Sequence, residues 1–205
     1  MTASLPQRAQ ALIDFWFGPP GDPEREHHRP IWFRSTKEHD DALRRLFLGD
    51  YEAAAAGALA AWEASAEGAL ALLLLLDQIP RNIFRDTPRA YDTDAAARAV
   101  ADRALAQGFD DHVPPAWRIF FYMPFHHSED LADQRRAEAL AAPLRIGRDP
   151  ESRGANRRYG MPYPEVIARF GRFPHRNRIL GRRSTPEEAA FLAECEARRR
   201  ADQRA

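Results

Sequence analysis

The stretch Leu72-Leu73-Leu74-Leu75-Leu76 is followed directly by Asp77-Gln78-Ile79-Pro80-Arg81-Asn82, and this change of character decides how the middle of the chain folds. Five successive leucines put apolar side chains on every face of a helix, so that helix must be buried on nearly all sides. Polar and charged side chains follow at once around a proline, and each buried polar group without a partner costs roughly 1–3 kcal/mol. The stretch therefore predicts either a structural polar network, in which Asp77 pairs with Arg81, or the floor of a binding site.

Pro80 is expected to interrupt the leucine helix, which we place at 67–78. Proline has no N–H, so the carbonyl of Leu76, four residues earlier, loses its helical donor. A residue before proline is also disfavoured in the helical region, which predicts that Ile79 leaves the helix. The next segment, 81–85, would then point in a new direction.

The rest of the chain is also rich in Ala, Leu, Arg and Glu and lacks alternating β-branched runs, which favours helices throughout. We predict an all-α fold: one compact domain over 1–205, built from antiparallel helix pairs in a tetratricopeptide-like or α-solenoid-like arrangement, with 198–205 frayed. Proline, glycine and capping residues mark the expected elements. These are 7–17, a helix from a Ser35 or Thr36 cap to Gly49, short pieces over 51–62, a helix over 94–107 capped by Asp92 or Thr93, one opened by Pro114-Pro115, one from Pro124 to about Arg148, a loop over 149–160, one over 163–170, and one begun by Thr185-Pro186.

Composition narrows the class of protein. The chain has 30 basic and 30 acidic residues, so its net charge gives no long-range attraction for nucleic acid. The single cysteine, Cys195, excludes an intramolecular disulfide and a cysteine-based zinc cluster. No apolar run approaches the roughly 20 residues that span a bilayer, and the first residues do not resemble a signal peptide. We expect a cytoplasmic protein without a membrane partner.

A second group of polar residues follows an aromatic run, where Phe121 and Tyr122 precede Pro124 and then His126-His127-Ser128-Glu129-Asp130. On a helix starting at Pro124, His126, Glu129 and Asp133 would share one face, as metal ligands could. Alternatively, His127 with Glu129 or Asp77 forms an acid–base pair, because histidine titrates near neutral pH. The structural alternative is that Glu129 and Ser128 serve a helix N-terminus.

A third group lies in a basic segment over 143–183, which holds eleven arginines against three acidic residues. Phe170 and Phe173 lie among these arginines, so single-stranded RNA could stack there. Alternatively, the arginines pair with acidic residues elsewhere in the fold. The run Phe173-Pro174-His175-Arg176-Asn177 also repeats the pattern of Ile79-Pro80-Arg81-Asn82, so two such turns could converge on one pocket.

These segments together resemble a bacterial family of uncharacterised proteins, the domain of unknown function 924. The matching stretches cover most of the chain: DFWFG (14–18), LLLLDQIPRNIFRDTPRAYDTD (73–94), GFDD (108–111), FFYMPFHHSEDLADQ (120–134) and RFGRFPHRNRILGRRSTPEEAAFL (169–192). The resemblance implies an all-helical, tetratricopeptide-like fold and no known reaction. The family more often has an apolar residue at His126, which favours His127 as the functional histidine.

From these observations we expect a pocket that binds a small anionic or polar molecule, walled in part by Trp16 and Trp32. No specific cofactor is indicated, and no metal ligands are assigned. The expected binding residues are Gln78, Arg81, Asn82, Phe121, Tyr122, Ser128, His175, Arg176 and Asn177, and the candidate catalytic residues are His127, Glu129 and Asp77. Three alternatives stay open: a helical scaffold that binds a peptide or protein partner, a hydrolase with His127 as general base, and RNA binding through 143–183.

Overall fold

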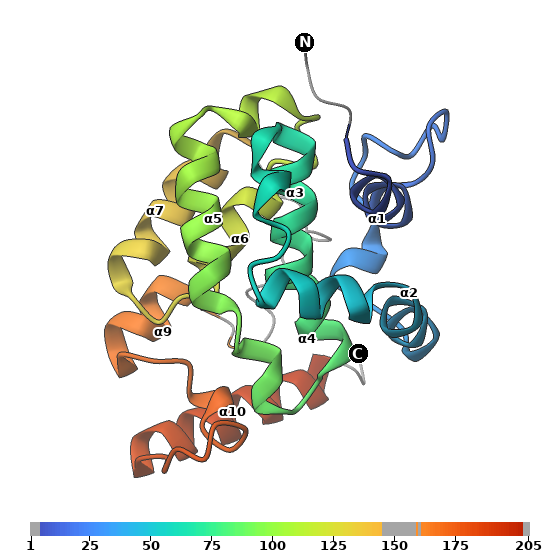
Figure 1. The fold of residues 1–205 in the computed structure, drawn as a ribbon. Helices are drawn as coiled ribbons and strands as arrows, with labels where there is room; N and C mark the ends of the chain where they lie inside the picture. The colour runs from blue at the N-terminus through green and yellow to red at the C-terminus, as the bar shows by residue number, and fades with distance from the viewer. Residues whose placement is uncertain (1–4, 145–158, 160, 203–205) are drawn as a thin grey trace. The chain divides into compact units, whose positions relative to one another are not determined.

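The computed structural model describes residues 5–144, 159 and 161–202, and this part of the chain contains helices and turns but no strand. The all-α prediction is therefore confirmed (Figure 1). The chain divides into two compact units, Met1–Pro124 and Phe125–Ala205, which we describe separately. The tetratricopeptide-like pairing and the single domain over 1–205 stay predictions.

The first unit is built around the leucine-rich segment. Its helices are α1 (Gln7–Phe17), α2 (Lys37–Ala55), α3 (Ala66–Leu73), α4 (Ile79–Ile83) and α5 (Asp94–Ala106), and α6 (Ile119–His126) runs across the boundary into the second unit. Short 3₁₀ turns lie at Pro30–Trp32, Ala60–Ala64, Pro88–Tyr91 and Phe109–His112. Helix α3 contacts α1 and α5, while α2 contacts α4 (Figure 1). Every residue of 68–80 is buried, as the leucine run predicts.

The predicted break at Pro80 is wrong, because a π-helical turn carries the chain past the proline. Leu74–Gln78 is π-helical, and the Ile79 N–H donates to the carbonyl of Leu74, five residues earlier. Ile79 itself has helical angles, φ −58° and ψ −47°. The wider turn changes the hydrogen-bond register and places Pro80 in the first turn of α4, a position that tolerates proline.

The prediction that the Leu76 carbonyl lacks a donor from Pro80 is correct, and Thr93 supplies a donor instead. The Thr93 hydroxyl donates to the Leu76 carbonyl oxygen at 2.5 Å, and Thr93 is buried. Thr93 also stands at the start of α5, as expected, but its side chain makes no capping bond to that helix. This bond ties the start of α5 to the π-helical turn.

Several other helix ends follow the sequence signals. Helix α1 has the predicted bounds, and Thr36 caps α2 by accepting from the His39 N–H at 3.3 Å. Helix α2 does not end at Gly49 but continues to Ala55. One internal glycine costs only about 1 kcal/mol, and burial of Tyr51 and Ala54 offsets it.

The second unit contains α7 (Leu131–Ala141), α9 (Tyr163–Phe170) and α10 (Pro186–Asp202), with short turns at Ala142–Leu144 and Pro174–Arg176. Helix α7 contacts α9, and an apolar cluster lies beside α9 and α10: Tyr159, Val166, Ile167, Phe173, Phe191 and Cys195. Helix α10 begins after Thr185, as predicted, and its start is a capping box in which the Glu188 N–H donates to the Thr185 hydroxyl and the Thr185 N–H donates to the Glu188 carboxylate.

The predicted helix from Pro124 to about Arg148 is wrong. Pro124 lies inside α6 and starts no helix, while α7 begins after Asp130, whose carboxylate accepts the Ala132 N–H at 2.7 Å. Helix α10 continues to Asp202, and the fraying of 198–205 stays a prediction. The predicted loop at 149–160 lies outside the described residues, apart from Tyr159.

Candidate functional site

In the first unit, Asp77 and Arg81 form the centre of a buried ionic network. Arg81 Nη1 lies 3.2 Å from Asp77 Oδ1 and 2.8 Å from Asp94 Oδ1, and Nη1 also donates to the Asp77 carbonyl. Asp77 is 1% exposed, and the Gln78 side-chain amide donates to it at 2.6 Å. Burial lowers the pKa of Arg81, but the charges of Asp77 and Asp94 more than offset this and raise it. The sequence predicted the Asp77–Arg81 pair but not the second carboxylate.

Asn82 continues this network toward the start of α2. Its amide nitrogen donates to the Gln78 carbonyl at 3.1 Å, and its oxygen accepts from Arg85 at 2.8 Å. Arg85 also binds the Asp40 carboxylate through Nε at 2.6 Å. The polar residues after the leucine run therefore join α4 to α2 within the first unit.

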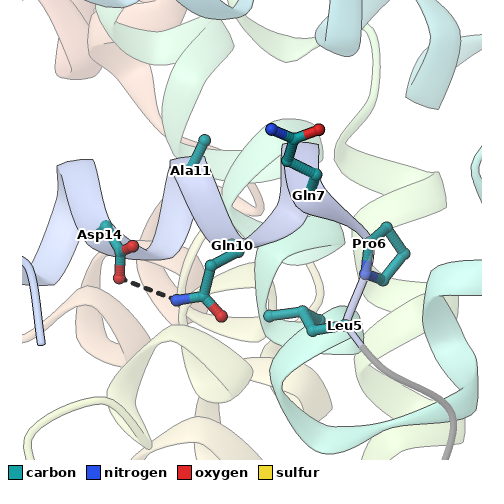
Figure 2. A pocket seen from close by; sticks show the side chains of 6 residues that line it. All are labelled: Leu5, Pro6, Gln7, Gln10, Ala11 and Asp14. Atoms are coloured by element: carbon teal, nitrogen blue, oxygen red, sulfur yellow. Dashed lines mark hydrogen bonds between the residues drawn. The ribbon is translucent and has the colours of Figure 1, made fainter.

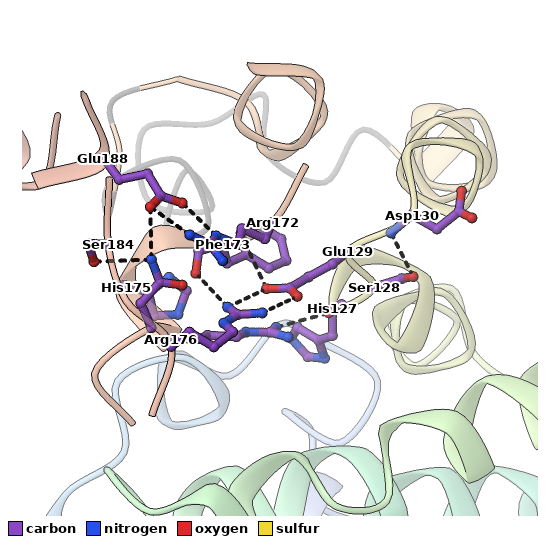
Figure 3. Close-up of polar contacts among 12 residues, drawn as sticks. His127, Ser128, Glu129, Asp130, Arg172, Phe173, His175, Arg176, Ser184 and Glu188 are labelled. Carbon is purple, nitrogen blue, oxygen red and sulfur yellow. Dashed lines mark hydrogen bonds and ion pairs between the residues drawn. The ribbon is translucent and has the colours of Figure 1, made fainter. Parts of the chain in front are cut away.

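In the second unit, two of the predicted segments come together. We call this group the loop cluster: His127, Ser128, Glu129, Arg172, Phe173, His175, Arg176, Asn177, Arg182, Ser184 and Glu188. Figure 3 shows how contacts of Glu129, Phe173 and Arg176 join the turn before α7 to the segment before α10. Residues about 45 positions apart in sequence are thus held side by side. The convergence of this proline turn with Ile79-Pro80-Arg81-Asn82 stays a prediction.

Glu129 anchors the loop cluster. Its two oxygens accept from Arg182 Nη1 at 2.6 Å and Nη2 at 2.9 Å, and Oε1 also accepts the Phe173 N–H at 2.8 Å. Burial raises the pKa of Glu129, but the bonds from Arg182 and the Phe173 N–H outweigh burial and lower it. Glu129 therefore stays ionised and ties two loops together, and its role in orienting His127 stays a prediction.

Glu188 anchors the other side of the cluster. It is 2% exposed and binds Arg172 through Nε at 2.6 Å and Nη2 at 2.9 Å. The Asn177 amide nitrogen donates to Glu188 at 3.2 Å. The bonds from Arg172 are the main cause that lowers the pKa of Glu188, to about 2. Burial raises this pKa, whereas the bonds from the Thr185 N–H and from Asn177 lower it further. The sequence analysis predicted a helix start at Thr185-Pro186 but no contact between Glu188 and Arg172.

Arg176 lies between these anchors. It is 7% exposed, its guanidinium carbon is 4.6 Å from the centroid of the Phe173 ring, and Nη2 donates to the His127 carbonyl at 2.9 Å. His175 is half-buried, contacts Phe173 at a centroid distance of 5.8 Å and hydrogen-bonds the Tyr159 hydroxyl. The predicted residues Arg176, His127 and His175 therefore belong to one group.

The loop cluster also contains buried polar atoms that lack a hydrogen-bond partner among the described residues. They are Arg182 Nε, a donor, and Asn177 Oδ1, an acceptor. Asn177 is 0% exposed. Buried polar atoms are nearly always satisfied, so each of these two needs a water or a bound molecule as its partner. The sequence marked Asn177, but nothing in it distinguished Arg182 from its neighbours.

Gln134 is a further residue that the sequence analysis missed. It is 0% exposed, and its amide nitrogen donates to the carbonyls of His126 at 2.7 Å and Ser128 at 2.6 Å, with Phe125 at 3.3 Å. These carbonyls end α6, so Gln134 caps that helix from α7. The spacing from His126 to Gln134 gives no local signal for this.

The remaining predicted residues have structural contacts. Ser128 is buried, and its hydroxyl accepts the Asp130 N–H at 3.1 Å. Phe121 is buried, while the Tyr122 hydroxyl donates to Asp110 at 2.7 Å and its pKa is raised by burial and by that carboxylate. Trp16 and Trp32 are buried in the first unit, where both contact Phe120. That all the predicted residues line one pocket stays a prediction.

The residues considered as metal ligands do not share one helix. His126 closes α6 and Asp133 lies in α7, so they do not share one helix with Glu129, and the described residues contain no group of three possible metal ligands. Among the arginines of 143–183, Arg169 pairs with Glu187 at 2.9 Å. None of the described helices is long and apolar enough to cross a membrane.

An open depression of about 720 Å³ lies at the start of α1 (Figure 2). It is lined by Leu5, Pro6, Gln7, Gln10, Ala11 and Asp14. The Gln10 amide donates to Asp14 at 2.8 Å there. None of the residues predicted for the site lines this depression.

Comparison with known proteins gives a family without an assigned activity. The model of the family described as "Bacterial protein of unknown function (DUF924)" matches residues 12–196. A solved structure of a protein of unknown function from Agrobacterium tumefaciens is 41% identical, with a TM-score of 0.77, and the match covers 91% of this chain and 97% of that one. The comparison with curated proteins gave no match.

Proposed function

We propose that this chain, which belongs to the DUF924 family of bacterial proteins of unknown function, binds a small anionic or polar molecule at the loop cluster of its second unit. The observation that carries this proposal is the pair of buried atoms that have no partner within the described part of the chain, Arg182 Nε and Asn177 Oδ1. A ligand with both acceptor and donor groups, such as a hydroxy acid or a phosphate ester that keeps a free hydroxyl, would satisfy the two atoms.

The surrounding side chains favour an anionic ligand. Arg172, Arg176 and Arg182 all lie in the cluster, and arginine recognises carboxylate and phosphate through paired N–H donors. Glu129 and Arg182 hold each other through two bonds, which fixes the guanidinium before a ligand arrives. Preorganisation of this kind reduces the entropy lost on binding.

The π-helical turn at Leu74–Gln78 supports a binding role for the family's central motif as well. Single π turns inside α-helices are rare and occur frequently at functional sites. Here the turn carries buried Asp77 and Gln78, and a plain leucine helix would avoid the desolvation of both. Buried polar residues in an otherwise apolar helix, such as these two, are typical of functional sites.

Melting temperature measured against inorganic phosphate, sulfate, small carboxylates and nucleotides tests the proposal. An anion at 100 times its dissociation constant adds about 2.7 kcal/mol, which for a chain of this size raises the melting temperature by roughly 5–11 °C. We expect one anion class to produce such a shift in the wild type.

Three variants separate a binding site from a structural network. Arg176→Gln should lose the shift, and so should His127→Gln, which keeps the backbone carbonyl that Arg176 contacts. Arg169→Gln removes an exposed arginine that pairs with Glu187 in the same unit, and it should keep the shift. The proposal is wrong if no anion shifts the wild type, or if the shift is the same in all three variants.

A further inference from the structure

We propose a second oxyanion site in the first unit, formed by Trp16 of α1, Arg29 directly before the turn at Pro30–Trp32, His39 of α2 and Arg85 after α4. We call these four residues the indole site. It shares no residue with the loop cluster and does not depend on the function proposed for that cluster. Its ligand would be a compact carboxylate or phosphate.

The indole N–H of Trp16 is the first observation. Trp16 is 1% exposed, and its Nε1 is buried without a hydrogen-bond partner in the described part of the chain. An indole nitrogen can only donate, so what it lacks is an acceptor. The other tryptophans nearby do have one: Trp32 Nε1 donates to the Trp16 carbonyl and Trp117 Nε1 to the Arg25 carbonyl, both at 2.8 Å.

The positively charged side chains of Arg29 and Arg85 belong to the same region of the first unit. Arg29 Nη1 lies 3.5 Å from the Trp16 carbonyl oxygen, and the His39 ring centroid lies 6.3 Å from that of Trp16. Burial is the main cause that lowers the pKa of His39; Asp40 opposes it, and the charges of Arg29 and Arg85 lower it further. Arg85 also lies near His39, because it binds the carboxylate of the adjacent Asp40 at 2.6 Å.

Asp40, the carboxylate whose charge raises the pKa of His39, already accepts hydrogen bonds from other residues. Asp40 accepts from Arg85 at 2.6 Å and 3.2 Å and from the Ser35 hydroxyl at 2.6 Å. His39 also lies in the first turn of α2, where the helix dipole favours a negative charge. Two arginines and an indole donor thus lie near the start of α2, where Asp40 is already bound to Arg85, and this arrangement suits an added anion.

Aromatic side chains give the surface near this site a partly apolar character. The His28 ring stacks on Phe33 at 5.6 Å and 16°, and it contacts Trp32 at 5.5 Å. Phe33 is 42% exposed, which is unusual for a large apolar side chain in this chain. An organic anion could therefore add apolar contact to the charge interaction, and bind more tightly than inorganic phosphate.

Nuclear magnetic resonance of the four indole N–H groups provides a direct test, because each tryptophan gives one ¹H–¹⁵N signal. Trp16→Phe identifies the Trp16 signal, and its nuclear Overhauser contact with the His39 ring identifies it if that variant does not fold. Titration with inorganic phosphate, and separately with benzoate, should move the Trp16 signal in a saturable way. The Trp62 signal, from elsewhere in the unit, should stay in place.

Arg29→Gln and Arg34→Gln form a matched pair from the same segment. Arg34 is exposed, whereas Arg29 contacts the Trp16 carbonyl. We expect Arg29→Gln to weaken phosphate binding at least tenfold and Arg34→Gln to leave it within twofold. The proposal is overturned if the Trp16 signal does not move with either anion, or if the two variants bind phosphate equally well.

Discussion

The hydrogen bond from Thr93 to Leu76 offers a prediction whose size follows from the structure. Pro80 cannot donate to the Leu76 carbonyl, Leu76 is 2% exposed, and the Thr93 hydroxyl donates to that oxygen at 2.5 Å. Thr93→Val keeps the shape of the side chain and removes the hydroxyl, which donates to Leu76 and also hydrogen-bonds Tyr51. Leaving a buried acceptor unsatisfied costs about 1–3 kcal/mol, so we expect the free energy of unfolding to fall by that amount.

Chemical denaturation of wild type, Thr93→Val and Thr93→Ser measures this loss of stability. Thr93→Ser keeps the hydroxyl and loses one methyl group, which costs about 0.8 kcal/mol of apolar burial. If the hydroxyl is what matters, Thr93→Val should be less stable than Thr93→Ser. The reverse order, or a Thr93→Val protein within 0.5 kcal/mol of wild type, would refute the reasoning.

A second background isolates the role of the proline. Pro80→Ala supplies an N–H four residues after Leu76, so the helix can offer its own donor to that carbonyl. In this background the cost of Thr93→Val should shrink, and a double-mutant cycle gives the difference directly. An unchanged cost would mean that Pro80 does not create the need for Thr93.

The other predictions concern titratable or amide groups. Glu188→Gln should lower the free energy of unfolding at neutral pH by up to about 3 kcal/mol, because the pKa of Glu188 is about 2 instead of 4.5 and each pKa unit corresponds to about 1.4 kcal/mol. Urea denaturation should show that wild type loses this advantage as pH falls from about 4.5 toward 2. Gln134→Glu replaces a donor to three carbonyls with a carboxylate, so the variant should be destabilised at pH 7 and regain stability as acid protonates the new side chain. His39 has a lowered pKa, so wild type should lose stability as pH falls below about 6.5, and His39→Gln should lack this part of the pH dependence, as melting between pH 5 and 8 would reveal.

The sequence predicted most helix ends because the signals there are local. Thr36 and Thr185 cap the helices that follow them, and Gly171, with φ 67°, ends α9. Each of these residues acts on a backbone group within three or four positions. The leucine run likewise revealed its burial, since no face of such a helix can be polar.

The features that the sequence analysis missed depend on distant partners. The π-helical turn accepts a hydrogen bond from the Thr93 hydroxyl, 17 residues from Leu76, and Gln134 caps carbonyls of a different helix. Glu129 binds Arg182, 53 residues away, within a segment where several arginines offer the same charge. Local pattern identifies the chemistry of such residues but not which partner each one reaches.

Hydrogen-exchange mass spectrometry, with and without the anion that most raises the melting temperature in the panel above, is the most direct test of the proposed function. We expect that anion to slow exchange at 127–130 and 172–184, the two segments of the loop cluster, and not in Arg176→Gln. Protection confined to residues outside the cluster, or no protection at all, would contradict a ligand site there and leave the cluster as a structural network.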